Sequence, residues 1–158
     1  MATLQTTPGN PLPLLRPALT LISWTFIMEA WMYATRIPAV NKYKPPIRPA
    51  MTKEEMNAVL PPQVRWKADN YNHLHEQPTI FYAVIGALAI AEVVKGGAVA
   101  GGVLKELDLG LAWGYVGIRV VHSLVHAMAN PIMMRFGIFA SSSFVLLGLT
   151  GRALAAVF

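Results

Sequence analysis

Four long apolar stretches, separated by links that contain polar residues, glycine or proline, constrain this chain more than any other feature. A helix needs about 20 apolar residues to cross the hydrocarbon core of a bilayer, which is ~30 Å thick. The sequence therefore predicts four membrane-spanning helices, at about residues 14–37, 64–94, 107–129 and 132–157. We expect residues 1–158 to form a single domain, an all-α integral membrane protein built as an antiparallel four-helix bundle.

The composition of the chain agrees with a lipid environment. Charged residues make up 13% of the sequence and hydrophobic residues 54%, whereas about 25% of the residues in a soluble domain are charged. The sequence contains no cysteine, which excludes a disulfide scaffold, a thiolate metal site and a cysteine nucleophile. These features favour a multi-pass membrane protein.

The basic residues are concentrated in one segment. Seven of the 13 lysines and arginines lie between Arg36 and Lys67, in the link at about residues 38–63 and at its edges. Links rich in lysine and arginine stay on the cytoplasmic side of a membrane. Membrane orientation therefore explains the net charge of +5, and we expect no nucleic-acid partner. The link 38–63 is predicted to be cytoplasmic, with both termini on the non-cytoplasmic side.

Ionisable residues of the third predicted span fall on one helix face. Arg119, His122 and His126 are separated by three and four residues, and a helix turns by about 100° per residue, so their side chains lie on the same side. Tyr115 and Asn130 extend this face in the two directions. Ionisable groups inside a membrane are costly and rarely face lipid. This face is therefore predicted to line a protein interior or a cavity.

The other predicted spans carry polar residues in similar register. These are Arg65, Asp69, Asn72 and Glu76 in the second span, Glu29, Tyr33 and Arg36 in the first, and Arg135 at the start of the fourth. With a rise of about 1.5 Å per residue, Glu29, Glu76 and Arg119 lie at similar depths below the cytoplasmic surface. The pattern predicts a polar cavity that opens to the cytoplasm.

The charged residues also have a purely structural interpretation. An ion pair between Glu76 and Arg119 could tie the second and third spans together without any ligand. The long side chain of Arg135 could simply reach the polar interface of the membrane. Neither interpretation accounts for the whole set of polar groups gathered at one end of the predicted bundle.

The histidines leave further alternatives open. His122 and His126 could be hydrogen-bonded histidines of the core. Together with His73 and His75 they could form a haem or zinc site. However, His73 and His75 flank the polar face of the second predicted span, so we expect no metal.

The third span and the start of the fourth resemble a known family. The segment Arg119-Val-Val-His122-Ser, followed by Arg135, is similar to the Arg-x-x-His-[Thr/Ser] pattern and the fourth-helix arginine of the membrane-associated proteins in eicosanoid and glutathione metabolism, the MAPEG family. His126 stands where the eukaryotic enzymes often have tyrosine. The chain looks more like a bacterial branch of the family.

The second span adds to this resemblance. The segment Asn72-His-Leu-His-Glu76-Gln-Pro78, followed by Phe-Tyr, resembles the Asn-x-x-Glu-x-x-Pro signature of the family, with different spacing. The motifs cover residues 63–158, and the four-helix plan covers the whole chain. The resemblance places the protein in a bacterial inner membrane.

The resemblance implies a homotrimer that binds glutathione between neighbouring subunits on the cytoplasmic side. A lipophilic co-substrate would enter from the bilayer. Glutathione carries two carboxylates, an amine and a thiol, so its site needs cations, a carboxylate and amide-type partners. On this interpretation Arg135 and Arg119 activate the thiol. The expected binding residues are Arg36, Arg65, Asn72, Glu76, Tyr115, His122 and His126.

These observations lead to one leading hypothesis and two alternatives. The leading hypothesis is a membrane-bound, glutathione-dependent transferase or peroxidase that acts on lipophilic electrophiles. The first alternative is a non-catalytic lipid-binding or scaffold protein with the same fold. The second is a small haem or quinone electron-transfer subunit that uses the histidines.

Overall fold

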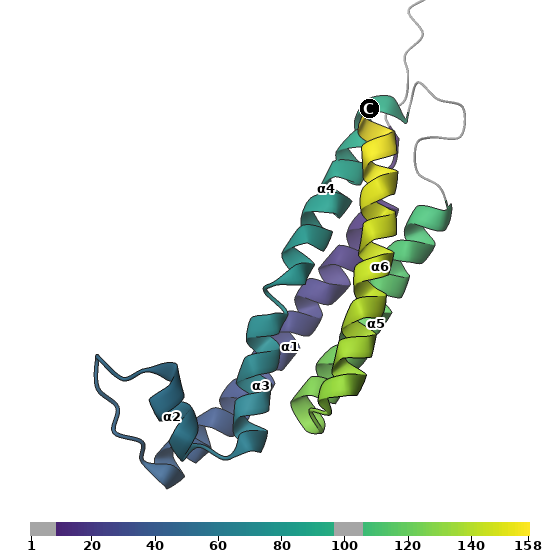
Figure 1. Ribbon diagram of the computed structural model, residues 1–158. Coiled ribbons are helices and arrows are strands. Elements are labelled where there is room, and N and C mark those ends of the chain that lie inside the picture. The colour runs from purple at the N-terminus through teal and green to yellow at the C-terminus, as the bar shows by residue number, and fades with distance from the viewer. Residues whose placement is uncertain (1–8, 97–105) are drawn as a thin grey trace, which may run out of the picture.

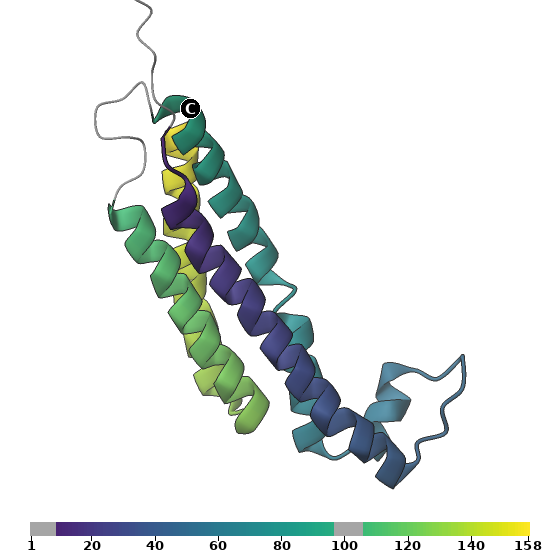
Figure 2. The same ribbon diagram turned by 180° about the vertical axis from the view of Figure 1, so that it is seen from behind.

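The computed structural model describes residues 9–96 and 106–158, and these residues form helices without a strand. In chain order the helices are α1 (Leu12–Tyr43), α2 (Lys53–Val59), α3 (Pro62–His73), α4 (Gln77–Lys95), α5 (Glu106–Met128) and α6 (Ile132–Val157). Figure 1 shows α1, α3 continued by α4, α5 and α6 side by side, with successive rods running in opposite directions. The short α2 lies apart from them at one end, called here the α2 end, as the reverse view also shows (Figure 2).

The outward faces of the helices are apolar. Phe26 on α1, Ile90 on α4 and Phe144 on α6 are 66%, 66% and 74% exposed, an arrangement that suits lipid and not water. By length and hydropathy, two helical segments of the described residues qualify as membrane spans, Pro62–Lys95 and Ile132–Val157. Helices α1 and α5 carry ionisable residues such as Glu29 and Arg119, which lower their mean hydropathy.

The main apolar core lies away from the α2 end. Leu21, Phe81 and Leu149 are fully buried there, and the rings of Phe81 and Tyr115 stack with centroids 4.5 Å apart. A smaller apolar cluster of the described residues, around Met28, lies nearer the α2 end. In lipid, such close side-chain packing is a principal force that holds helices together. Arg119, His122 and His126 of α5 therefore occupy the half of the array where apolar packing is least extensive.

The first helix is longer than the sequence predicts. It does not stop before Pro38 but continues to Tyr43. It ends where Lys44 adopts a left-handed conformation, with φ 44°, and donates its N–H to Val40 O. The predicted link 38–63 thus contains the end of α1 and also α2, whose first turn has a capping box formed by Thr52 and Glu55. This Ser/Thr-x-x-Glu pattern is a helix-start signal that could have been read from the sequence.

The second predicted span is also different, because it is not one continuous helix. Helix α3 ends at His73 and α4 begins at Gln77, with Glu76 in a non-helical conformation (φ −86°, ψ −96°). Pro78 is the cause, since proline lacks an N–H for the carbonyl four residues earlier and its ring clashes with that carbonyl, here of Leu74. The break resets the helical phase, so residues before and after it do not share the face predicted for an unbroken helix.

An ion pair joins α5 to α6 at the end opposite α2. Arg152 Nε and Nη2 donate to the two carboxylate oxygens of Asp108 at 2.7 and 3.1 Å. Asp108 is fully buried, whereas Arg152 is partly exposed. The planar guanidinium matches the geometry of a carboxylate, which makes such a two-bond pair strong and directional.

Replacing Arg152 with glutamine is expected to lower the free energy of unfolding by about 3 kcal/mol, because the buried Asp108 carboxylate then lacks this cation. The melting temperature in detergent should fall accordingly. The double variant Asp108→Asn/Arg152→Gln should recover part of the loss in stability, since it removes the buried Asp108 carboxylate together with its cation. An unchanged melting temperature in the single variant would show that the pair does not stabilise the fold.

Candidate functional site

A pocket of about 230 Å³ opens between the end of α3, α5 and the first turns of α6. It lies in the half of the array nearer the α2 end, where α3 and α6 are separated, whereas α4 and α6 pack together at the other end (Figure 1). The pocket is lined by His73, His122, Ile132, Arg135, Phe136 and Phe139. It therefore combines two imidazoles and a guanidinium with apolar walls.

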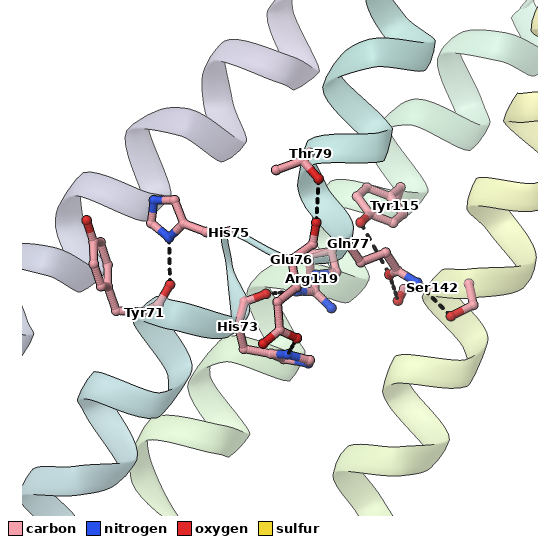
Figure 3. Close-up of polar contacts among 10 residues, drawn as sticks. Tyr71, His73, His75, Glu76, Gln77, Thr79, Tyr115, Arg119 and Ser142 are labelled. Atoms are coloured by element: carbon pink, nitrogen blue, oxygen red, sulfur yellow. Dashed lines mark hydrogen bonds and ion pairs between the residues drawn. The ribbon is translucent and has the colours of Figure 1, made fainter. Parts of the chain in front are cut away.

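Arg119 contacts two residues that line this pocket, Phe139 and His73. Its side chain is fully buried, its guanidinium carbon lies 5.8 Å from the centroid of the Phe139 ring, and Nη2 donates to the carbonyl oxygen of His73 at 3.0 Å (Figure 3). Its Nε and Nη1 have no hydrogen-bond partner. No carboxylate of the described residues forms an ion pair with this guanidinium, including Glu76. A buried cation with unused donors is costly, so this arrangement is suited to an anionic ligand.

His73 forms part of the same wall. Its Nδ1 lies 2.5 Å from Glu76 Oε2 (Figure 3), and its ring centroid lies 5.0 Å from that of His122 and 5.9 Å from that of His126. The structural interpretation of Glu76 paired it with Arg119, but in the structure Glu76 pairs with His73 instead. Sequence reasoning placed His73 at the flank of the polar face because it assumed an unbroken helix.

The two α5 histidines are buried beside this wall. His122 and His126 are 1% and 4% exposed, and the Nδ1 atom of each has no hydrogen-bond partner. No group of histidine and acidic side chains among the described residues has an arrangement that could hold a metal ion. Their rings lie close to that of His73, beside the pocket that Arg135 also lines.

Arg135 reaches the pocket because of the turn between α5 and α6. Asn130 adopts a left-handed conformation (φ 56°), and Pro131 then starts the next helix, which places Arg135 in the first turns of α6. The Arg135 Nη1 donates to Asn130 Oδ1, and its Nε is buried without a partner. A helix N-terminus also favours negative charge, so both features attract an anion.

A hydrogen-bond network lies between the pocket and the main apolar core, to which Tyr115 belongs. The side-chain oxygen of Gln77 accepts bonds from the hydroxyls of Tyr115 at 3.3 Å and Ser142 at 2.9 Å (Figure 3), and its nitrogen donates to Ser143 Oγ. Tyr115, a predicted binding residue, is fully buried within this network and does not line the pocket. Gln77 was not predicted, and its position beside Pro78 in the sequence gave no specific signal.

Of the seven predicted binding residues, His122 alone lines this pocket. Glu76 and His126 are neighbours of His73 in its wall, and Tyr115 belongs to the hydrogen-bond network beside it, whereas Arg36, Arg65 and Asn72 belong to neither. Arg36 lines a different pocket near α2, where its Nη2 lies 2.8 Å from Met56 Sδ. Arg65 is half-buried on α3 and does not line the site, and Asn72 is exposed. The buried asparagine of α3 is Asn70, which donates to Ser123 Oγ at 2.8 Å.

Comparison with known proteins identifies the family. A family model described as the MAPEG family matches residues 14–155, nearly the whole chain. A search of curated proteins and a search of solved structures each gave no match. The matched range contains the pocket and every residue that lines it. The chain belongs to the MAPEG family, a family of integral membrane proteins.

Proposed function

We propose that this protein is a membrane-bound, glutathione-dependent transferase or peroxidase that acts on lipophilic electrophiles. The observation that carries this proposal is the fully buried Arg119, whose Nε and Nη1 are unused beside an open pocket in a MAPEG-family chain. A protein that needed Arg119 only for packing would supply partners for these donors, since buried polar groups are almost always hydrogen-bonded. A bound anion would supply them.

The chemistry of the pocket suits glutathione. Arg119 and Arg135 are cations for its carboxylates and its thiolate, and Glu76, whose side chain is 66% exposed, is accessible to an amine. The walls formed by Phe136 and Phe139 offer an apolar surface to a co-substrate that arrives from the bilayer. The pocket therefore presents both a polar and a lipophilic subsite.

The working form that we propose is a homotrimer with one glutathione between neighbouring subunits. The location of Arg36 supports this arrangement, because this predicted ligand lies at a separate pocket beside Met56 in its own chain and would reach the site of a neighbour only across a subunit contact. A trimer would also shield the polar faces from lipid, where exposed ionisable groups are costly. Each subunit contributes four spans: α1, α3 with α4, α5 and α6.

Two measurements on the detergent-purified protein test this proposal together. Native mass spectrometry should give a trimer, and the aryl halide 1-chloro-2,4-dinitrobenzene should be conjugated to glutathione. Glutathione binding without turnover would favour the non-catalytic alternative, and a visible haem absorption band would favour an electron-transfer role. A monomer or dimer that still binds glutathione would contradict the shared-site arrangement.

The proposed orientation places α2 in the cytoplasm of a bacterial cell and both chain termini on the other side of the inner membrane. We expect an impermeant maleimide to label a cysteine at Glu106 in intact spheroplasts, and a cysteine at Lys53 only after the membrane is permeabilised. The chain has no cysteine of its own, so no background substitution is needed. Labelling at position 53 alone in intact spheroplasts would reverse the orientation.

A further inference from the structure

The two arginines can stabilise a thiolate, but a separate group is needed to accept the thiol proton, and the contact between Glu76 and His73 bears on that step. We propose that His73 is the proton-transfer residue of this site: it accepts the thiol proton of glutathione and returns it to an oxygen that leaves carbon during the reaction, with Glu76 as its positioning residue. This inference rests on the proposed glutathione-dependent function.

The hydrogen bond at Nδ1 determines how His73 can act. A carboxylate 2.5 Å from Nδ1 keeps the proton on that nitrogen and leaves Nε2 as an acceptor, as a carboxylate does for the histidine of a catalytic triad. The His73 carbonyl oxygen accepts the Arg119 bond, which also holds the residue in place. His73 lines the pocket, whereas Glu76 does not and its side chain is exposed. The free nitrogen is therefore available to a molecule in the pocket.

His73 contacts Arg119 and lines the same pocket as Arg135, an arrangement that suits transfer of the thiol proton to its imidazole. Arg135 lines the same pocket and Arg119 contacts Phe139 of its wall, so a thiolate formed there is stabilised within reach of the imidazole. His122 and His126 are each within 6 Å of the His73 ring, at centroid distances of 5.0 and 5.9 Å. However, their Nδ1 atoms have no carboxylate partner. Among the three rings, His73 is the one held by an acid.

With an epoxide as co-substrate, the proton of the thiol is first removed and later returned to the product. The thiol proton moves to His73 Nε2, and the thiolate sulfur uses its electron pair to form a bond to an epoxide carbon. The carbon–oxygen bond breaks with its electrons on oxygen, and this alkoxide takes the proton back from Nε2. The products are a hydroxy thioether and an unchanged imidazole, and no further reactant is needed.

The reaction of an aryl halide at the same site needs a base but no acid. Its leaving chloride is a stable anion and needs no proton, so His73 would serve only to remove the thiol proton. At high pH, hydroxide can take up the thiol proton in place of the imidazole, so this step no longer depends on His73. Loss of His73 should therefore be relieved by high pH with an aryl halide but not with an epoxide.

The experiment compares glutathione conjugation of styrene oxide and 1-chloro-2,4-dinitrobenzene by the full-length protein in nanodiscs at pH 7 and pH 9. The charged and titratable groups around His73 are Glu76, Arg119 and Arg135, with His122 and His126 on α5, and all of them are retained in the variants of His73 and His75. We expect His73→Gln to lower kcat for styrene oxide about 100-fold at both pH values, as is typical of a lost general acid. With the aryl halide, the loss at pH 7 should largely disappear at pH 9.

His75→Gln is the matched control. His75 lies two residues away, within the break between α3 and α4, where its Nδ1 bonds to Tyr71 O at 2.9 Å (Figure 3). This variant should keep the wild-type pH profiles with both substrates. Glu76→Gln, which retains His73 but removes the orienting charge, should give the same substrate-dependent pattern with a smaller loss, and it serves if His73→Gln does not fold.

The outcomes separate this inference from the function on which it rests. If wild-type protein does not bind glutathione, the proposed function fails and the inference fails with it. If wild-type protein binds glutathione, three results overturn the inference alone: no turnover of styrene oxide, an equal loss with both substrates at both pH values, or no loss in either variant. The inference is supported if, at pH 9, His73→Gln loses activity with styrene oxide but not with the aryl halide.

Discussion

Replacing Arg135 with leucine is expected to lower the rate of aryl halide conjugation about 25-fold at pH 7. A free thiol of pKa ~8.5 is only about 3% ionised at this pH, and a fall of ~2 units would make the thiolate the major form. That fall requires about 2.7 kcal/mol of preferential stabilisation of the anion. One guanidinium in a partly dehydrated pocket can supply an effect of this size.

Arg135 is the residue best placed for this role. It lines the pocket, its buried Nε is unused, and it lies in the first turns of α6, where the helix dipole favours an anion. Its bond to Asn130 holds the side chain against the turn and away from the solvent.

The measurement follows the ultraviolet absorbance of bound thiolate together with turnover, as a function of pH, in wild-type protein and in Arg135→Leu. Arg16→Leu, which changes an exposed arginine of α1, is the matched control and should behave as wild type. If both the thiolate signal and turnover survive in Arg135→Leu, this residue only reaches toward the membrane interface, and Arg119 is the activating group.

Replacing Arg119 with methionine is expected to have the largest effect on glutathione affinity, a loss of at least 100-fold. Removal of one partner from a buried, hydrogen-bonded charge pair costs about 2–5 kcal/mol or more, and 2.7 kcal/mol corresponds to 100-fold. The same variant should keep or raise the melting temperature of the ligand-free protein, because methionine removes a fully buried cation whose Nε and Nη1 have no partners.

This opposition between affinity and stability distinguishes a ligand-binding arginine from a structural one. Glutathione affinity is measured by calorimetry and the melting temperature by thermal unfolding of the same detergent-purified sample. A large fall in melting temperature with unchanged affinity would show that Arg119 mainly holds α5 to the end of α3 through its bond to His73 O.

The helical plan could be predicted from hydrophobicity, but its interruptions could not be predicted from hydrophobicity alone. The predicted and observed bounds of the last helix are both 132–157, because Asn130 and Pro131 give a clear break. The end of the first helix was wrong, since Pro38 near a helix end removes only one backbone bond and does not stop the helix. Pro78 was the more informative proline, because it divides the second predicted span.

The predicted polar faces of α5 and α3 have different outcomes. On the unbroken α5, the spacing of Arg119, His122 and His126 correctly places them on one buried face. On α3 the predicted face selected Asn72, which is exposed, in place of Asn70, which is buried. Positions that are two residues apart in the sequence lie about 200° apart around a helix. An error of two residues in the predicted face therefore exchanges the buried and the exposed side of the helix.

The location of His73 depends on features that no local pattern contains. Its ring meets Phe139 of α6 at a centroid distance of 5.3 Å, and this contact joins residues far apart in the sequence. It exists only because α3 ends at His73 and Glu76 leaves the helical path. The roles proposed for Arg119 and Arg135 rest on the family pattern, whereas the role proposed for His73 comes from the three-dimensional arrangement.

Calorimetric titration of reduced glutathione into wild-type and Arg119→Met protein shows whether the pocket between α3, α5 and α6 is a glutathione site. We expect saturable binding to the wild-type protein and at least 100-fold weaker binding to the variant, whose melting temperature is not lowered. Absence of glutathione binding by correctly folded wild-type protein, or equal affinity in the two proteins, would contradict the account.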